Sequence, residues 1–424
     1  MDQFQKMKII SIFHFLFLIF STFFFIAQPS RIHNLTSSQN RLAFFIFGDS
    51  FVDPGNNNFI NTTEPFRANF TPYGQTFFKY PTGRVSDGRI MPDFIGNYSK
   101  SYTKKSLSTL LSISCSNKSI SLTAEYANLP LIPAYLDPHN KLYIHGANFA
   151  SGGAGVLLKL IEDSYDSSSI NQIKPTALHC AIGIETQLRY FKKVERSIRK
   201  KLGDSRAYDL FSNSVYFFHI GGNDYKVPFE GSSVHEKYSE TEHAYMVIGN
   251  LTAVLEEIYK KGGRKFAFVG IPPLGCLPHT RLLNKNGDGS CWDEASALAT
   301  LHNKLFPIAL QKFADKFPGF KYTVADMYTM LQNRIDNPSK YGFKEGKKAC
   351  CGSGKFRGIF SCGRMRGEEE FELCENPNEY LFFDSYHPNE RAYEQFAKLM
   401  WSGDSQVINP YNLKQFFQYG SLQA

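Results

Sequence analysis

The sequence predicts an α/β protein whose mainly parallel sheet is covered by helices on both faces. Short apolar runs that suit buried strands alternate with longer stretches of helical periodicity, which is the pattern of such sheets. One helical stretch ends at two adjacent glycines and leads directly into an apolar strand, as a helix–strand unit requires. With 424 residues, of which 42% are hydrophobic, the chain can bury a large core.

Each expected element has its own signal in the chain. The strands are short runs rich in β-branched and aromatic residues, at residues 42–47, 215–220, 265–270 and 322–325. The helices are expected at residues 240–261, 293–317 and 389–401. The first helix repeats apolar residues at helical spacing and ends before Gly262 and Gly263, where a left-handed residue is easily accommodated. The last helix follows Pro388.

The N-terminal residues predict export from the cell. Lys6 and Lys8 precede an apolar run over residues 9–27, which fits a secretory signal peptide at residues 1–30. The 19 residues of this run also approach the length of a membrane span, so an uncleaved anchor is the alternative. No comparable apolar run follows. We therefore expect no stable membrane span once the signal is removed.

The cysteines and the glycosylation triplets agree with a secretory route. Four cysteines share one glycine-rich stretch without a C-x-x-C pair, which favours disulfides over a zinc site. They are Cys350, Cys351, Cys362 and Cys374, and Cys276 and Cys291 bracket a loop that a further bridge would close. The pairing stays open. Six N-x-S/T sequons are candidate glycosylation sites: Asn34, Asn61, Asn69, Asn97, Asn117 and Asn250.

One segment departs from the α/β pattern. Residues 96–123 hold 12 serines or threonines among 28 residues, four lysines and no acid, without a helical or strand period. Deleting them joins residues 91–95 to residues 124–129 in a helix that starts at a proline. We interpret the segment as an insertion, either translated from a retained intron or forming a surface loop, within one domain that spans residues 41–415.

The net charge does not indicate a nucleic-acid partner. The formal charge of the chain is +8, and the four lysines of the insertion account for half of it. No block of lysine and arginine is interleaved with stacking aromatic residues. We expect no nucleic-acid binding, whereas attraction to an acidic cell wall or membrane surface stays open.

A serine, a histidine and an aspartate are placed as the parts of a hydrolase. Ser50 lies in the run FGDSFVDPG, just past the end of the first strand, where an open α/β sheet presents a nucleophile. A serine hydroxyl needs a nearby base at neutral pH, and an imidazole, which titrates near pH ~6.5, can take up and return its proton. His387 is the candidate base, and Asp384 would orient it. The run GDSFV is not G-x-S-x-G, so an α/β-hydrolase is not expected.

Two further segments are suited to binding an oxyanion. Residues 146–155 are a glycine-rich stretch able to bring a backbone N–H close to a ligand. The run GGND follows the strand expected at residues 215–220, and the side-chain amide of its Asn223 can donate a hydrogen bond. Alone, each segment would be an ordinary turn. Together with Ser50 and His387 they supply every part of an acyl-transfer site.

With these four segments the chain resembles the plant branch of the GDSL lipase/esterase family, the SGNH hydrolases, and within it the secreted, pathogen-responsive lipases. The resemblance runs from about residue 43 to the C-terminus, and it includes the runs RANF, PTGR, IPPLGC, CCGSG and YLFFD. It implies a three-layer α/β/α, flavodoxin-like fold and hydrolysis of an ester or lipid without metal or organic cofactor. The implied roles are Ser50 as nucleophile and oxyanion donor, Gly153 and Asn223 as further oxyanion donors, and Asp384 and His387 as the rest of the triad.

The resemblance has consequences and departures beyond the triad. It implies a secreted protein of the apoplast or cell wall that acts in plant defence, and we expect a monomer. Phe383 stands where a tryptophan is common and Asn389 where a threonine is common, and both changes are conservative. Residues 96–123 have no counterpart in the family pattern. Cys115 and Cys180 are also not expected from it, and they are either free or paired with each other.

Three points stay open at this level. Gly152 and Gly155 are alternatives to Gly153 as the backbone donor to the oxyanion. An acyltransferase, in which an alcohol rather than water takes the acyl group from Ser50, would use the same residues. A catalytically inert secreted binding protein on the same fold is the alternative from another class, because fold does not establish activity. The intact set of triad residues and Asn223 argues against it.

Overall fold

The computed structural model describes residues 42–95, 127, 129–140, 143–157, 181–226, 238–364 and 370–418. They fall within one unit of the fold, Arg41–Ala424. Several predictions lie outside the described residues: the signal peptide at residues 1–30, the insertion at residues 96–123, the sequons at Asn34, Asn97 and Asn117, and the cysteines Cys115 and Cys180.

A six-stranded sheet forms the centre of the described fold, with the strand order β10-β5-β4-β3-β1-β2. Its strands are β1 (Phe44–Gly48), β2 (Gly146–Asn148), β3 (Val215–His219), β4 (Lys265–Val269), β5 (Lys321–Ala325) and β10 (Ile408–Asn409). Neighbouring strands are parallel except for the edge pair of β10 and β5, which is antiparallel. The mainly parallel sheet is therefore confirmed.

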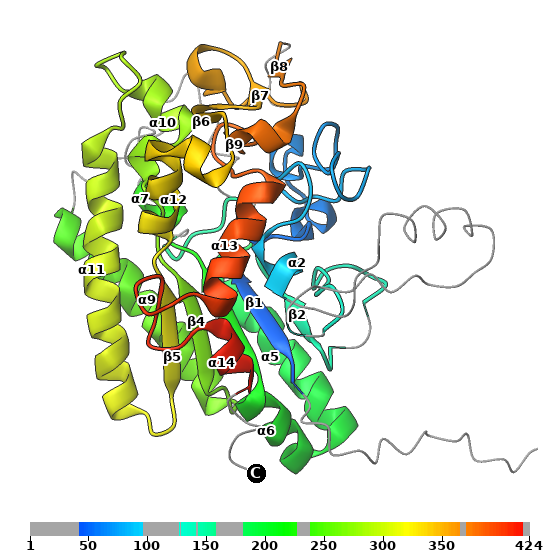
Figure 1. Cartoon of the computed structure of the whole chain (residues 1–424). Helices are drawn as coiled ribbons and strands as arrows, with labels where there is room; N and C mark the ends of the chain where they lie inside the picture. The colour runs from blue at the N-terminus through cyan, green and yellow to red at the C-terminus, as the bar shows by residue number, and fades with distance from the viewer. Residues whose placement is uncertain are drawn as a thin grey trace, which may run out of the picture. The chain divides into compact units, whose positions relative to one another are not determined.

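Side chains on β1 alternate between the two faces of this sheet. The ring of Phe45 packs against Phe191 of α5, with 5.4 Å between ring centroids. The ring of the adjacent Phe44 meets Phe417 of α14, also at 5.4 Å. One face is covered by α5 (Ile184–Leu202), α6 (Asp204–Asn213), α9 (Glu240–Lys260) and α11 (Asp293–Lys316), and the other by α2 (Met91–Ile95), α13 (Glu390–Ser402) and α14 (Leu413–Gln418) (Figure 1). These layers confirm the α/β/α architecture.

The helices predicted from the sequence form within one or two residues of their expected bounds. Helix α9 begins after Ser239, whose hydroxyl accepts a hydrogen bond from the N–H of Glu242 while the Glu242 side chain reaches back, a capping box. After it Gly262 has a φ of +112°, the positive value expected of a residue that follows a helix. Asn389 precedes α13 as its cap instead of opening it, because its side chain accepts a hydrogen bond from the N–H of Ala392.

Two small sheets lie beside the main one, and the sequence did not predict them. The first pairs β6 (Glu345–Ala349) with β9 (Tyr380–Phe382), and the second pairs β7 (Cys351–Gly352) with β8 (Glu372–Leu373). Two disulfides, Cys350–Cys374 and Cys351–Cys362, join these strands to the loops around them. The expected disulfides are thus present, with the two adjacent cysteines bound to different partners.

The remaining elements are short and connect the layers. They are the helices α7 (Gly222–Lys226), α10 (Pro278–Leu283) and α12 (Met327–Asp336), and the 3₁₀ helices η1 (Asn56–Phe59), η2 (Glu64–Phe66), η5 (Leu274–Cys276), η6 (Pro338–Tyr341), η7 (Lys355–Arg357) and η8 (Pro377–Glu379). Across the ranges that the structure describes, none of the helices has both the length and the apolar character needed to span a bilayer.

Candidate active site

Three strand ends bring distant parts of the chain together. Strands β1, β2 and β3 are parallel neighbours, so their carboxyl ends lie at one edge of the sheet. Ser50 follows β1, Gly153 follows β2 and Asn223 follows β3. Within the sheet, β2 is the neighbour of β1 on one side, and β3, which comes later in the chain, is its neighbour on the other side. Ser50 therefore lies at a topological switch point, where open α/β sheets form a crevice.

The structure brings the predicted triad residues into one chain of hydrogen bonds. Ser50 Oγ lies 2.7 Å from His387 Nε2. On the other side of the ring, His387 Nδ1 lies 2.8 Å from Asp384 Oδ1. With Asp384 accepting at Nδ1, the neutral imidazole carries its proton there and presents the Nε2 lone pair to the serine hydroxyl. This is the arrangement that a base for a serine nucleophile requires.

Asp384 and His387 are only three residues apart in the chain, and a tight loop after β9 explains how their side chains can form a hydrogen bond. Asp384 Oδ1 accepts hydrogen bonds from the N–H groups of Tyr386 and His387, each at 2.9 Å, which curls the loop around the carboxylate. The N–H of Phe383 donates to the His387 carbonyl at 2.8 Å and closes the loop. The hydroxyl of Tyr73 donates to Asp384 Oδ2 at 2.7 Å. Asp384 is fully buried, so these donors replace its hydration.

The three glycines that are candidate donors to the oxyanion differ in whether the N–H group is already hydrogen-bonded and in whether the residue lines the cavity. The N–H of Gly152 donates to Asp53 at 2.9 Å. Gly153 lines the cavity at Ser50, and among the described residues its N–H has no acceptor. Gly155 does not line this cavity and lies against the Asp224 carboxylate. Only Gly153 of the three therefore has a backbone donor left to offer there.

The backbone of Gly153 and the amide of Asn223 are both held in fixed positions. Gly153 has a φ of +83°, and a Cβ at this position would come within 2.8 Å of the Phe66 ring. A larger residue would thus meet both strain and a clash. One N–H of the Asn223 amide donates to the Ala154 carbonyl at 2.8 Å, which leaves the second N–H for a ligand.

Two buried carboxylates fix the loop that carries Gly153. Asp53 accepts hydrogen bonds from the N–H groups of Gly55 and Asn56, both at 2.7 Å, in addition to Gly152. Asp224 accepts from the N–H groups of Val156 and Leu157 at 2.7–3.0 Å. Burial raises the pKa of Asp53 and that of Asp224 to about 6, although their backbone donors act in the opposite direction.

The side-chain amides of two consecutive asparagines donate further hydrogen bonds to the same loop. The amide of Asn56 donates to the carbonyls of Asn148 and Ala150, at 2.9 and 2.8 Å. The amide of Asn57 donates to the Gly152 carbonyl at 2.9 Å. The segment that follows Ser50 is therefore tied by side chains to the loop that carries Gly153, and these bonds hold the two segments together.

A cavity of about 220 Å³ opens at Ser50. Its lining holds Gly153, Asn223 and His387, together with apolar side chains on the remaining walls. Those apolar residues are Phe51, Phe66, Val85, Pro272, Leu274, Leu277, Phe360 and Tyr386. A larger cavity of about 600 Å³ lies between α11, β5 and β10, but it holds none of the predicted site residues. Of these two cavities, only the smaller one is lined by predicted site residues.

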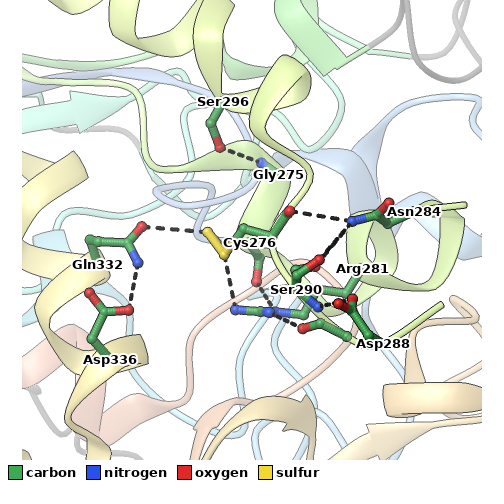
Figure 2. The surroundings of a disulfide bond; sticks show 11 residues. Gly275, Cys276, Arg281, Asn284, Asp288, Ser290, Ser296, Gln332 and Asp336 are labelled. Atoms are coloured by element: carbon green, nitrogen blue, oxygen red, sulfur yellow. Dashed lines mark hydrogen bonds between the residues drawn. A yellow bond between two sulfur atoms is a disulfide. The ribbon is translucent and has the colours of Figure 1, made fainter. Parts of the chain in front are cut away.

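A disulfide fixes the segment that follows β4 and supplies part of this wall. Leu274 and Leu277 line the cavity, and Cys276 between them is bonded to Cys291, as the sequence suggested. Figure 2 shows the surroundings of this bridge, where the buried Arg281 side chain donates to the Cys276 carbonyl at 2.8 Å. The N–H of Gly275 donates to the Ser296 hydroxyl at 3.1 Å. The wall is therefore held from α10 and from α11.

Several residues of the site were missed by the sequence analysis. Asp53 lies in the GDSFVDPG run and Asp224 in the GGND run, yet only their contacts reveal that they hold the loop that carries Gly153. Tyr73 lies 311 residues before the aspartate that it contacts, and Lys226 reaches the cavity wall from α7. The last two had no signal in the sequence, because a contact between distant segments leaves no local pattern.

Comparison with known proteins identifies the family of this chain. A family model described as GDSL-like lipase/acylhydrolase matches residues 44–400. A GDSL lipase of Tanacetum cinerariifolium is 46% identical over 384 residues, which cover 90% of this chain and 89% of that protein. GDSL esterase/lipase 5 of Arabidopsis thaliana is 44% identical over 95% of this chain and 94% of its own length. GDSL esterase/lipase 1 of the same plant is 42% identical over 95% and 97%.

These matches confirm two predictions, the resemblance to the plant branch and the enzyme class. The family model spans the sheet from β1 to α13, and the relatives match over most of both chains. The chain therefore belongs to the GDSL-like lipase/acylhydrolase family, a family of carboxylic ester hydrolases.

Proposed function

We propose that the protein is a secreted serine esterase or lipase that hydrolyses carboxylic esters through an acyl-Ser50 intermediate. The observation that carries this proposal is the continuous hydrogen-bond chain from Ser50 Oγ through His387 to Asp384, with distances of 2.7 and 2.8 Å. The chain opens into a largely apolar cavity, which suits an acyl group.

In the proposed reaction Ser50 Oγ attacks the ester carbonyl carbon while His387 Nε2 takes the hydroxyl proton. The negative charge on the former carbonyl oxygen is held by the N–H groups of Ser50 and Gly153 and by the Asn223 amide. Collapse of this intermediate breaks the ester C–O bond, and His387 returns the proton to the leaving alcohol. Water then attacks acyl-Ser50 by the same steps, which releases the acid and restores the serine. Asp384 stabilises the imidazolium throughout.

Secretion is the second part of the proposal. Three disulfides in the described residues are compatible with an oxidising compartment. The sequons at Asn61, Asn69 and Asn250 are exposed, as glycan attachment requires. Together with the signal-like N-terminus, these features support a secreted, glycosylated protein of the apoplast or cell wall, where the family resemblance points to a role in plant defence. We propose that it acts as a monomer.

A panel of esters with graded acyl length, assayed on the protein collected from the medium of expressing cells, tests the proposal. Release of free acid that requires Ser50 is the expected result. Transfer of the acyl group to an added alcohol with no release of acid would identify an acyltransferase instead. A secreted and folded protein that turns over no ester and is not modified by a serine-reactive probe would be an inert binding protein.

Replacing the side-chain donor to the oxyanion separates a catalytic role from a structural one. Asn223→Ala is expected to lower kcat about 10²-fold or more with little change in KM, because this donor matters mainly once charge develops on the oxygen. Steady-state kinetics on one soluble ester would measure both constants. An unchanged kcat would leave Asn223 with a role only in the turn that begins α7.

The buried carboxylates predict that activity and stability change in opposite directions with pH. Asp53 and Asp224 have folded-state pKa values of about 6, raised from 3.8 by burial. Their stabilising contribution is therefore fully present below pH ~3.8 and is lost as pH rises through ~6. Only their ionised forms bind the loop N–H groups strongly, so kcat/KM should rise over the same window.

Measuring the melting temperature and kcat/KM between pH 4.5 and 7.5 (roughly the window of these groups) tests this coupling. We expect the melting temperature to fall and kcat/KM to rise with pH, with a plateau on the alkaline side. A rate maximum near pH ~4 would point to a carboxylate base. A melting temperature that rises across the window would mean that the buried aspartates have lowered pKa values.

Removal of residues 96–123 tests the proposed boundaries of the functional domain, residues 41–415. We expect a chain without this segment to be secreted and to hydrolyse esters at least as well as the full chain, because loop-closure entropy changes by only ~0.6 kcal/mol per doubling of loop length. A clear loss of secretion or activity would assign the segment a working role, such as a specificity loop. Sequencing the mature transcript tests its origin, and a transcript that always encodes the segment would refute the retained intron.

A further inference from the structure

Lys226 is the one lysine or arginine among the described residues that line the cavity at Ser50. It is the last residue of α7, three residues after Asn223, and this spacing places the two side chains on one face of the helix. Its Nζ lies 3.9 Å from the centroid of the Tyr386 ring, and the residue is only partly exposed. The ring therefore holds the ammonium at the wall of the cavity by a cation–π contact.

The position of the Lys226 ammonium indicates which half of the ester substrate it can contact. Tyr386 directly precedes His387, and the centroids of their rings lie 6.1 Å apart. In ester cleavage the leaving alcohol takes its proton from His387 Nε2, so the alcohol half of the ester must lie against this imidazole. A substituent on that alcohol that extends past the Tyr386 ring would reach Lys226, because the ammonium lies against that ring.

The surroundings make this charge effective. The ring of Phe360 lies next to Tyr386, with 5.1 Å between their centroids, and Leu274 and Leu277 line the same cavity. Apolar walls lower the local dielectric constant and strengthen the attraction between a cation and an anion. Asp49 is the one carboxylate among the described residues of the cavity lining, and its Oδ1 accepts a hydrogen bond from the N–H of Phe51 at 3.1 Å and lies 3.0 Å from His219 Nδ1.

We propose that Lys226 is a specificity residue that selects esters whose alcohol half carries an anionic oxygen group, either a phosphate or a carboxylate. A lysine ammonium is a point charge with three donors, so it suits both groups and does not demand the paired geometry of arginine. The inference rests on the proposed function of the site, because it requires His387 to face the leaving alcohol.

Three octanoyl esters with the same acyl group test the inference. They are the neutral 1-octanoylglycerol, its 3-phosphate, and the octanoyl ester of glyceric acid, which carries a carboxylate. For each anionic ester, the ratio of its kcat/KM to that of the neutral ester is measured in the wild type, in Lys226→Met, in Lys226→Gln and in Lys226→Arg. Lys398→Met is the matched control, because Lys398 is an exposed lysine of α13 outside the cavity lining.

The ratio for at least one anionic ester is expected to exceed one in the wild type and to fall about tenfold or more in Lys226→Met and Lys226→Gln. It should stay close to the wild-type value in Lys226→Arg and in Lys398→Met, and it should decline as salt is added. Whether the phosphate or the carboxylate ester carries the effect identifies the anionic group.

Equal ratios in the wild type and in both neutral variants of Lys226 would overturn the inference, and so would a fall of the same size in Lys398→Met. In either case, if the wild type hydrolyses the neutral ester, the proposed esterase function still holds. The proposed function would fail by a different result, namely no hydrolysis of any of the three esters by the folded wild type. Measuring the melting temperature of each variant separates misfolding from lost selectivity.

Discussion

Ser50→Ala is expected to lower ester hydrolysis by about 10⁴-fold or more while leaving the protein folded and secreted. The alanine removes the atom that would form the acyl-enzyme bond. Among the described side chains, no other hydroxyl or thiol lies within hydrogen-bond distance of His387 Nε2 to replace it. Ser50 is only partly buried, at the turn after β1, so the loss of its hydroxyl removes little packing. Initial rates at saturating ester, with the melting temperature of the variant, measure both effects.

A matched serine in the same loop as the triad aspartate provides the control. Ser385 is buried, and its hydroxyl has no hydrogen-bond partner among the described residues. Ser385→Ala should therefore retain wild-type activity and stability. Activity that persists at the wild-type level in Ser50→Ala would remove Ser50 from the mechanism, whatever the control shows.

Asp384→Asn is expected to lower kcat about 10³- to 10⁴-fold with the fold preserved. The asparagine oxygen can still accept from the N–H groups of Tyr386 and His387, and the hydroxyl of Tyr73 can turn to accept from the new amide. The variant loses the negative charge that stabilises the imidazolium, so the effect belongs to the transition state rather than to binding.

Tyr73→Phe distinguishes this charge effect from a loss of support for the loop. It removes the donor to Asp384 Oδ2 but keeps the carboxylate charge, so we expect a loss of about tenfold, smaller than that of Asp384→Asn. Comparing kcat and KM for the two variants on one ester measures the difference. Equal losses in both would show that the position of Asp384, and not its charge, is what His387 requires.

The sequence predicted those parts of the fold whose signals are local. The buried strands next to Ser50 and Asn223 have apolar runs, and α9 has both its periodicity and its glycine stop, so their bounds were correct within two residues. Strand β2 was not predicted, because its three residues are too few for an alternating pattern and lie in a glycine-rich stretch that indicated a turn. The small sheets around the disulfides were missed because β7, β8 and β9 have only two or three residues and β6, with the sequence EGKKA, has no β-branched or aromatic residue.

The parts of the site that the sequence did not reveal depend on contacts between distant segments. The proposal of Gly153 rather than Gly152 as the backbone donor rests on one hydrogen bond between Gly152 and Asp53, 99 residues apart. The support of Asp384 by Tyr73 and the place of Lys226 beside Tyr386 likewise arise only once the chain is folded. Family blocks locate the reacting groups in the sequence, whereas the residues that position them are found from the three-dimensional contacts.

The most direct test of the account is to locate the covalent bond that it requires. The folded protein is treated with a fluorophosphonate probe, which reacts with activated serines and loses fluoride, and the modified peptide is identified by mass spectrometry. We predict a single modification on Ser50, formed in step with the loss of esterase activity and absent from Ser50→Ala. Modification of another serine in step with inactivation, or full inactivation with Ser50 unmodified, would contradict the acyl-Ser50 mechanism.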